Sequence, residues 1–479
     1  MRSLKASKPI LKAHPQIALL SFLSVILLFC GCASNMTAYY KDLRAKIDAG
    51  DYKSAAEFVD KSKGKYGKKN ILLFYLDAGM LNHLAQNYMD SAKYFESAKR
   101  KFEEYYQKSI TAGAMSMIYN DTSLPYYGEN FERVHIGAFE ALDYILDGQD
   151  NEAVVEARQS NTLFRQFAVE KNNKNFYKDD AFIRYFMGIV YENAGYINDA
   201  YISYIKAIKL YKDGIVPMPV PKDLVDSAYT TALQLGMKDR AADIKSEYPG
   251  AQETDIPEGY GECIIIDYHG FMPKKVDNVL EFALFNIWPY INQVTVDDDK
   301  ERRDFDKART IAISAFANDY IKVAFPKYEK IPNKIQSVTI RYGDSSARTY
   351  MVQDFGTLAQ KNLESEISKI YAKTLARAAV KYAIGKSVSK AVSDKTNSAW
   401  GTLTQIAFNL YNSLSETADK RGWNTLPETI LMSRIYLSEG TNEITVEFRD
   451  AGGNIIKTET ATVEIKRGGK TFVVVRSAM

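Results

Sequence analysis

The stretch from Arg184 to Asp213 decides the fold of the N-terminal half and reads RYFMGIVYENAGYINDAYISYIKAIKLYKD. Small residues and tyrosines recur along it: Gly188, Tyr191, Gly195, Ala200, Tyr204 and Ala207. Small residues are required where two helices cross closely, which we expect at Gly188 and Ala200. The tyrosines would fill the gaps beside them. The segment therefore predicts a closely packed pair of helices.

Weaker copies of this pattern occur along the N-terminal half at a period of about 34 residues, the length of the tetratricopeptide repeat (TPR). They comprise Gly50, Tyr52, Ala55 and Val59, then Gly79, Tyr88, Phe95 and Ala98, and then Gly148, Ala153 and Ala157. A degenerate pair from Leu224 to Pro249 would close the array. Because one unit cannot bury its own apolar face, neighbouring units must stack. The sequence predicts a TPR-like α-solenoid over residues 32–249.

After Pro257 the sequence becomes typical of strands. Apolar and polar residues alternate from Glu443 to Phe448, and turn-forming clusters follow at Asp450–Gly453 and Lys466–Lys470. We expect an antiparallel β-rich domain, a sandwich or small barrel, over residues 257–479. A helical pair at about residues 355–420 would interrupt it and pack on the sheet, with membrane or partner contact as the alternative. The fold class is therefore α+β.

The N-terminus has the layout of a secretory signal. Arg2, Lys5, Lys8 and Lys12 precede an uncharged apolar run from Ile17 to Phe29. A membrane-spanning helix needs roughly 20 apolar residues, so this shorter run favours a cleaved signal over a permanent anchor. We expect residues 1–31 to be the signal peptide.

The residues from Leu28 to Ser34, LFCGCAS, resemble the lipobox of bacterial lipoproteins. Gly31 supplies the small residue before the acceptor, whereas Cys30 follows the bulky Phe29. Cleavage is therefore expected between Gly31 and Cys32, with fatty acyl chains such as palmitate on Cys32. Several chains give durable attachment, since each buried CH₂ contributes about 0.8 kcal/mol. Ala33 is not an inner-membrane retention aspartate, which favours the periplasmic face of the outer membrane over the inner membrane.

Charge excludes some functions. The chain has 62 Lys and Arg against 59 Asp and Glu, and without the signal's four basic residues the balance is 58 against 59. A near-neutral mature chain has no overall field that would attract nucleic acid or an anionic membrane. Cys263 is the only cysteine besides Cys30 and Cys32, so the mature chain can form no intramolecular disulfide.

A long break from Ser109 to Arg133 interrupts the repeats. It contains Tyr126, Tyr127 and Phe131 close to Pro125 and Gly128. Long connections in compact arrays are functional or mobile, so these three aromatics form a candidate partner-binding loop. The alternative is that the rings pack on the solenoid.

No catalytic, metal or cofactor site is expected. His83 and His135 lie in helical sequence, where structural roles are commoner, and Cys263 with His269 would be about 20 Å apart along one strand. The aspartates at 297–299, 304 and 306 lack the glycine turn and terminal glutamate of a calcium loop, so we interpret them as a solvated loop. Phosphate-binding, zinc and nucleophile-elbow motifs are also missing from the sequence.

Several motifs together resemble one family. They are Tyr127–Val134, Ala141–Gly148, Ala153–Asn161, Thr374–Tyr382, Asp419–Pro427, Arg434 and Gly440. They are similar to those of poorly characterised proteobacterial TPR-containing lipoproteins, over nearly the whole mature chain. The genes of that family often lie beside one for a lipoprotein activator of penicillin-binding proteins. The resemblance therefore implies a role in envelope or peptidoglycan assembly, and it brings no catalytic residues.

The leading hypothesis is a membrane-anchored scaffold that binds proteins of the cell envelope, with peptidoglycan synthesis as the indicated process. The alternatives are a component of surface-polymer or secretion assembly and, third, an unrecognised hydrolase that uses Cys263 and His269. Partners would be envelope proteins, and the membrane through the lipid on Cys32. Nucleic acid is not expected.

The anchor assignment has a direct test. Cys32→Ser should abolish lipidation and leave an unprocessed precursor, because the thiol is the acyl acceptor and the processing enzyme requires it. Metabolic labelling with a clickable fatty acid measures this. Continued labelling of the variant would show that the anchor lies elsewhere.

Overall fold

The computed structural model describes residues 36–109, 122, 124–169, 177–283, 320–368, 370–371, 373–375, 378 and 418–479. The signal peptide with Gly31 and Cys32, much of the Ser109–Arg133 break, the aspartates at 297–306 and residues 379–417 of the expected helical pair lie outside these residues. The chain divides into two compact units, Met1–Ala45 and Lys46–Met479. In the first unit, residues 36–45 are helical. The second unit contains both the repeats and the strands.

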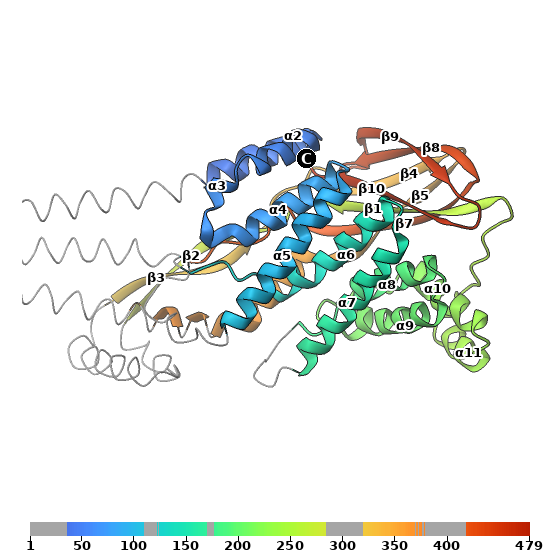
Figure 1. Cartoon of the computed structure of the whole chain (residues 1–479), viewed down its shortest axis with the longest axis horizontal. Helices are drawn as coiled ribbons and strands as arrows, with labels where there is room; N and C mark the ends of the chain where they lie inside the picture. Colours follow the sequence, from blue (N-terminus) through green and yellow to red (C-terminus); the bar gives the residue numbers. More distant parts are fainter. Residues whose placement is uncertain are drawn as a thin grey trace, which may run out of the picture. The chain divides into compact units, whose positions relative to one another are not determined.

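Helices fill the first part of this second unit (Figure 1). They are α2 (Tyr52–Asp60), α3 (Lys63–Tyr66), the 3₁₀ helix η1 (Lys68–Asn70), α4 (Ile71–Leu84), α5 (Tyr88–Ser109), α6 (Asn130–Leu146), α7 (Asp150–Val169), α8 (Ala181–Asn193), α9 (Ile197–Asp213), α10 (Lys222–Gln234) and α11 (Lys238–Glu247). From α4 onward they contact one another in successive pairs, α4 with α5 through α10 with α11. None of the helices in the described residues is long and apolar enough to span a membrane.

The pair α8–α9 shows why the sequence requires small residues. A Cβ added to Gly188 would lie 2.3 Å from Cε1 of Tyr204, so only glycine lets this ring pack against α8. Gly79 of α4 takes the ring of Phe95 from α5 in the same way, at 2.5 Å. The other residues expected at this contact are buried as well: Tyr191, Ala200 and Ala207. The same local geometry therefore occurs in two helix pairs.

The remaining part of the unit consists mainly of strands. They are β1 (Tyr260–His269), β2 (Lys274–Ala283), β3 (Tyr320–Glu329), β4 (Ser337–Tyr342), β5 (Ser345–Arg348), β6 (Tyr350–Asp354), β7 (Thr429–Ser438), β8 (Gly440–Arg449), β9 (Ile455–Ile465) and β10 (Lys470–Ser477). One sheet has the order β10-β1-β7-β6 and a second the order β5-β4-β8-β9, while β2 and β3 form a separate hairpin. With the helices before them, these sheets make the fold α+β.

One strand pairing differs from the antiparallel expectation. Strands β1 and β10 are parallel, with Glu262 opposite Lys470 and His269 opposite Ser477, whereas the other described pairings are antiparallel. The turn between Ile465 and Lys470 carries the chain from one sheet to the other. Strand β10 follows β9 in the sequence but does not pair with it, and instead pairs with the edge strand β1 of the first sheet in the parallel direction.

The two sheets pack face to face around one apolar core. Cys263 and Ile265 of β1 meet Val338 of β4 and Val446 and Phe448 of β8 in this core. Because successive side chains of a strand point to opposite faces, the intervening residues of β1 face away from this core, toward the helices. The order of layers is therefore helices, first sheet, second sheet.

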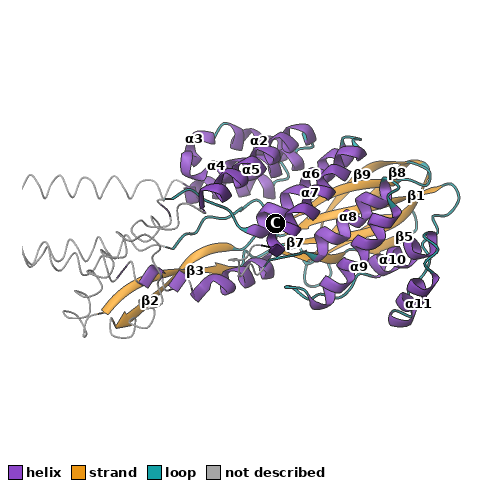
Figure 2. Cartoon of the chain, turned by 60° about the horizontal axis from the view of Figure 1, so that its bottom comes forward, coloured by secondary structure: helices purple, strands orange, loops and turns teal. Residues whose placement is uncertain are grey.

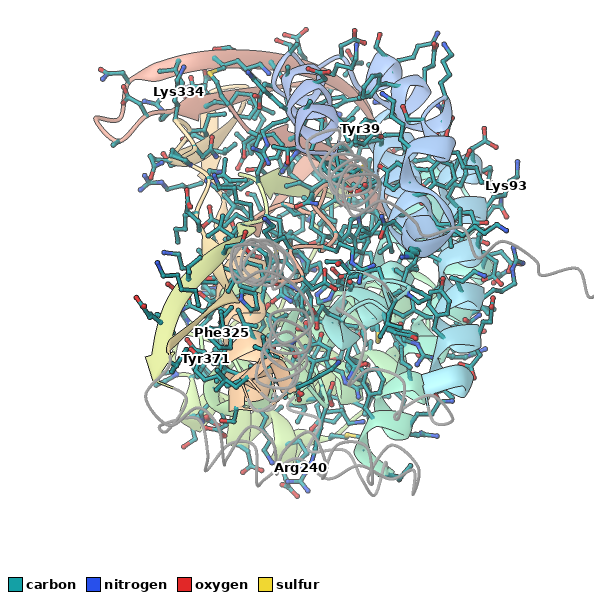
Figure 3. All side chains as sticks on the ribbon, turned by 90° about the vertical axis from the view of Figure 1, so that its left-hand side faces the viewer. Tyr39, Lys93, Arg240, Phe325, Lys334 and Tyr371 are labelled. Atoms are coloured by element: carbon teal, nitrogen blue, oxygen red, sulfur yellow. The ribbon has the colours of Figure 1, made fainter. Side chains whose placement is uncertain are left out.

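The hairpin β2–β3 packs against the helix that begins at residue 355. The rings of Phe325 on β3 and Tyr371 lie 4.2 Å apart between centroids, and both are labelled in Figure 3. Leu375, further along the same stretch, is buried. An isolated two-stranded hairpin is marginally stable, so this packing supports it.

The α8–α9 contact predicts the effect of a single substitution. Ala200 is fully buried, and Ala200→Arg should lower the free energy of unfolding by several kcal/mol because the contact has no room for a long charged side chain. Ile202 on the same helix is 43% exposed, so Ile202→Arg should change it by less than about 0.5 kcal/mol. Urea unfolding compares the two. Equal effects would show that α8 and α9 do not pack closely.

Candidate functional site

The first helix of each pair is buried on nearly all sides. This holds for most residues of α4, α6 and α8, whereas α5 buries one stripe, which includes Ala92, Phe95 and Ala98. In TPR arrays such repeats create an extended concave binding surface. Here the first sheet covers this inner face, and Figure 2 shows α8 lying against the strands. The surface where a partner would be expected is occupied by the chain itself.

Arg434 of β7 is the centre of the contact with α8 and α10. Its Nε donates to Glu262 of β1 at 2.5 Å, while Nη1 donates to the hydroxyl of Tyr185 at 3.2 Å and to that of Ser227 at 2.8 Å. Lys470 of β10 binds the other oxygen of Glu262 at 2.5 Å. The Nε and Nη1 groups of this buried guanidinium thus bind the sheet and two helices.

These charges control one another's ionisation. Burial by itself would raise the pKa of Glu262, but the charges of Arg434 and Lys470 and their hydrogen bonds outweigh it and lower this pKa to about 2. Glu262 in turn holds the pKa of Arg434 well above its usual range, against the effect of burial. The cluster is therefore ionised at neutral pH.

His83 of α4 joins α6 to the sheet. Its Nδ1 lies 2.6 Å from Asp143 of α6 and its Nε2 lies 2.9 Å from the hydroxyl of Tyr268 on β1. Burial raises the pKa of Asp143, partly offset by His83. The three side chains have the residue types of a proton relay, yet all are buried. A substrate cannot reach them, so they act as a structural link.

Glu132 of α6 organises the contact with the segment before β7. It accepts hydrogen bonds from the hydroxyl of Tyr126 at 2.7 Å and from the backbone N–H of Trp423 at 2.9 Å. Burial, and next the charge of Glu129, raise its pKa to about 7. The ring of Trp423 packs on Phe95 and Phe139. This carboxyl therefore connects the loop, through Tyr126, to the segment before β7, through Trp423.

A further link involves His135 of α6 and Gln353 of β6. His135 Nδ1 lies 2.7 Å from the carbonyl of Phe131, and its Nε2 lies 2.8 Å from Gln353 Nε2, which also donates to Asp180 at 2.9 Å. Burial lowers the pKa of His135. His83 and His135 thus both have structural partners within the interface.

The candidate hydrolase residues are engaged separately. Cys263 lies in the core between the sheets, where burial raises the pKa of its thiol to about 12. His269 Nδ1 lies 2.8 Å from the hydroxyl of Ser477, which donates to Asp267 at 2.7 Å. Burial lowers the pKa of His269 to about 4. The hydroxyl points to the aspartate and the thiol is protonated at neutral pH, so neither is an activated nucleophile.

The three aromatics of the candidate loop lie in different surroundings. Tyr126 is 5% exposed and lies under the guanidinium of Arg421, and Phe131 is 1% exposed. Tyr127 is 36% exposed and packs edge-on against Tyr105 of α5. Two rings therefore fix the loop to the molecule, as in the alternative interpretation, and Tyr127 alone of the three reaches the surface.

Sequence reasoning did not identify the helix–sheet interface. Its residues include Trp423 and Arg434, which belong to the motifs that resemble the lipoprotein family, and Glu132 and Tyr268. A signal was present: Glu262 and Arg434 place charges in strands that are otherwise rich in Ile, Leu and Met. Charged residues are rarely fully buried unless they are paired, so such positions indicate a partner layer.

An open groove lies between α5, α6 and α7. It has a volume of about 360 Å³ and is lined by residues that include Glu96, Arg100, Gly137, Gln159 and Gln166. At its floor Lys99 contacts Glu96 at 3.1 Å and both Glu140 and Glu156 at 2.9 Å. Burial and the neighbouring Glu156 raise the pKa of Glu140 to about 8. We name this the α5–α7 groove.

A smaller pocket of about 150 Å³ lies between the hairpin and the helix from residue 355. Its charges are paired: Lys275 binds Glu129 at 2.9 Å and Arg421 binds Asp419 at 2.6 Å. In the part of the chain that the structure describes, no group of His, Cys, Asp and Glu is arranged to hold a metal ion.

The chain was compared with protein families, curated proteins and solved structures. No family model and no curated protein matches the chain. Among solved structures, the TPR-like repeats of a Podosopora anserina kinesin light chain align with 45% of this chain and 93% of their own, at 11% identity and a TM-score of 0.29. MamA aligns at 14% identity over 46% and 97%, with a TM-score of 0.28, and apo RapI at 10% over 79% and 76%, with 0.33. At such scores the likeness carries no argument, and the repeats are defined by the helix contacts themselves.

The Glu262–Arg434 pair generates a pH-dependent prediction. Glu262→Gln should lower the free energy of unfolding at pH 7 by about 3–5 kcal/mol, because it leaves Arg434 buried without its counter-charge. In the native chain the folded pKa of about 2 lies below the ordinary value of 4.5. The stabilisation is therefore complete above pH 4.5 and is lost as the pH falls toward 2.

Urea unfolding across this pH range measures both effects. The variant should lack the loss between pH 4.5 and 2 that Glu262 causes. Glu443→Gln, at an exposed position of β8, is the matched control and should match the native chain. An unchanged stability at pH 7 would contradict the central role of the pair.

Proposed function

We propose that the chain is a lipid-anchored, non-catalytic scaffold that binds proteins of the cell envelope from the periplasmic face of the outer membrane. One observation carries the proposal: the buried polar side chains that resemble catalytic sets bind one another across the helix–sheet interface. His83, Asp143 and Tyr268 are the clearest case. These groups hold the interface together and are buried away from any substrate, which supports a binding role over catalysis. The lipobox-like residues around Cys32 support the anchor.

The partner surface in this proposal is the α5–α7 groove. The inner face of the repeats is covered by the first sheet, so a partner must bind elsewhere. The groove presents exposed polar side chains on α5 and α7, among them Arg100, Gln159 and Gln166. Tyr127 packs on Tyr105 of α5, which places the exposed aromatic of the loop on a helix that also lines the groove.

The resemblance to envelope lipoproteins indicates the kind of partner. Components of peptidoglycan synthesis are the first candidates, because genes of the similar family often lie beside one for an activator of penicillin-binding proteins. A surface-polymer or secretion assembly would use the same groove with a different partner. Identification of the crosslinked protein distinguishes these two.

Filling the groove tests the proposal. Thr162→Tyr combined with Gln166→Tyr places two rings in the groove at exposed positions of α7, so stability should stay within about 0.5 kcal/mol of the native chain. Crosslinking in native membranes followed by co-purification should then show at least a tenfold loss of envelope partners, about 1.4 kcal/mol of binding. Gln234→Tyr, at an exposed position of α10, is the control and should retain them. Full retention in the double variant would remove the groove from consideration.

A further inference from the structure

A second exposed surface lies in the segment before α4. Residues 61–70 read KSKGKYGKKN and contain five lysines and no acid. All five side chains are exposed, in contrast to Tyr66 between them, which is buried. We name these residues the basic patch: Lys61, Lys63, Lys65, Lys68 and Lys69. In a mature chain that is near neutral overall, this is a local concentration of positive charge.

The acidic residues of the neighbouring α2 have contacts of their own. Asp51 accepts the backbone N–H of Ser54 at 3.1 Å, and Asp60 accepts the hydroxyl of Tyr94 at 2.9 Å. Glu57 contacts Lys61 at 3.0 Å, in an exposed pair of small energetic weight. These carboxylates stay charged, but residues 51–70 carry six lysines against three acids, so the segment keeps a net charge of +3.

The patch lies next to the point where the chain enters the second unit. Lys46 is the first residue of this unit, and its ammonium lies 5.7 Å from the ring centre of Phe58. The ammonium of Lys65 lies 5.6 Å from the same ring. Residues 36–45 are helical, so the chain from Cys32 to Lys46 spans at most about 30 Å. A lipid on Cys32 would keep Lys46 within that distance of the bilayer, and the patch begins next to Lys46.

We propose that the basic patch binds anionic phospholipid headgroups of the membrane that holds the anchor. The proposal rests on the proposed lipid anchor at Cys32. Near an anionic bilayer each lysine contributes a factor of about five to binding, and the attraction falls off within a Debye length. The patch can therefore attract an anionic bilayer at short range, although the near-neutral chain as a whole does not.

The chemistry of the patch favours a lipid surface over a shaped partner. Its cations are all lysines, which act as flexible point charges, and it lacks the arginines that bind single carboxylates or phosphates in bidentate geometry. Neither the α5–α7 groove nor the smaller pocket is lined by a patch residue. Exposed ammonium groups outside a pocket suit a broad anionic surface.

Single-site labelling can test the contact in the full lipidated protein. Gly64 lies within the patch, and a Cβ there meets no atom within 4 Å, so Gly64→Cys can carry an environment-sensitive fluorophore. Cys263 is buried and Cys32 is acylated in the proposed form, so the label is specific. Quenching by headgroup spin-labelled lipid is measured in phosphatidylcholine vesicles with and without phosphatidylglycerol. A label at Gly250→Cys, also in open space, is the reference.

We expect quenching at position 64 with phosphatidylglycerol, and its loss in pure phosphatidylcholine or in about 1 M salt, where the Debye length is about 3 Å. Lys65→Gln, Lys68→Gln and Lys69→Gln together should reduce it to the phosphatidylcholine level. Lys178→Gln, Lys209→Gln and Lys238→Gln remove the same charge at exposed positions elsewhere and should leave it unchanged. Equal quenching in both lipids, or quenching that survives the patch variant, would overturn the proposal.

Flotation separates this proposal from the anchor on which it rests. A lipidated chain floats with phosphatidylcholine vesicles whether or not the patch binds. Failure to float with them would overturn the anchor, and the patch would then be judged by lysine-dependent flotation with phosphatidylglycerol vesicles.

Discussion

The ion pair between Arg434 and Glu262 is the contact on which the arrangement of the two halves depends. Both side chains are buried, at 5% and 1% exposure, and they lie on neighbouring strands that face the helices. A buried charge without its partner costs about 3–5 kcal/mol, so the guanidinium must keep Glu262, and it takes Tyr185 and Ser227 as further partners. Few positions of the helices on the sheet satisfy all of these at once.

The same principle applies along the rest of the interface. His83 with Tyr268, Glu132 with the N–H of Trp423, and Gln353 with Asp180 join successive helices to the strand half through buried polar contacts. Apolar packing tolerates small shifts, whereas an unmet buried hydrogen bond costs about 1–3 kcal/mol. The buried polar contacts thus fix the position of the helices on the sheet. The interface also uses the inner face of the repeats, so the proposed partners would have to bind on outer surfaces.

Two outer surfaces differ in kind. The α5–α7 groove is concave and polar, with Lys99 shared by three carboxylates at its floor, which suits a protein segment. The basic patch lies outside either described pocket and consists of lysines only, which suits a lipid surface. In the proposed arrangement, lipid on Cys32 would hold the patch toward the membrane and leave the groove for partners.

The sequence by itself determined the helix pairs and several strands, because the relevant contacts are local. Gly188 and Tyr204 are 16 positions apart and sit on consecutive helices, and alternation from Glu443 to Phe448 marks strand β8. Only the tertiary structure decided the parallel β10, the closed inner face and the burial of Tyr126 and Phe131. They depend on contacts between segments hundreds of residues apart, such as Arg421 with Tyr126 and Trp423 with Glu132. Periodicity in the sequence does not indicate which distant segment will cover a given face.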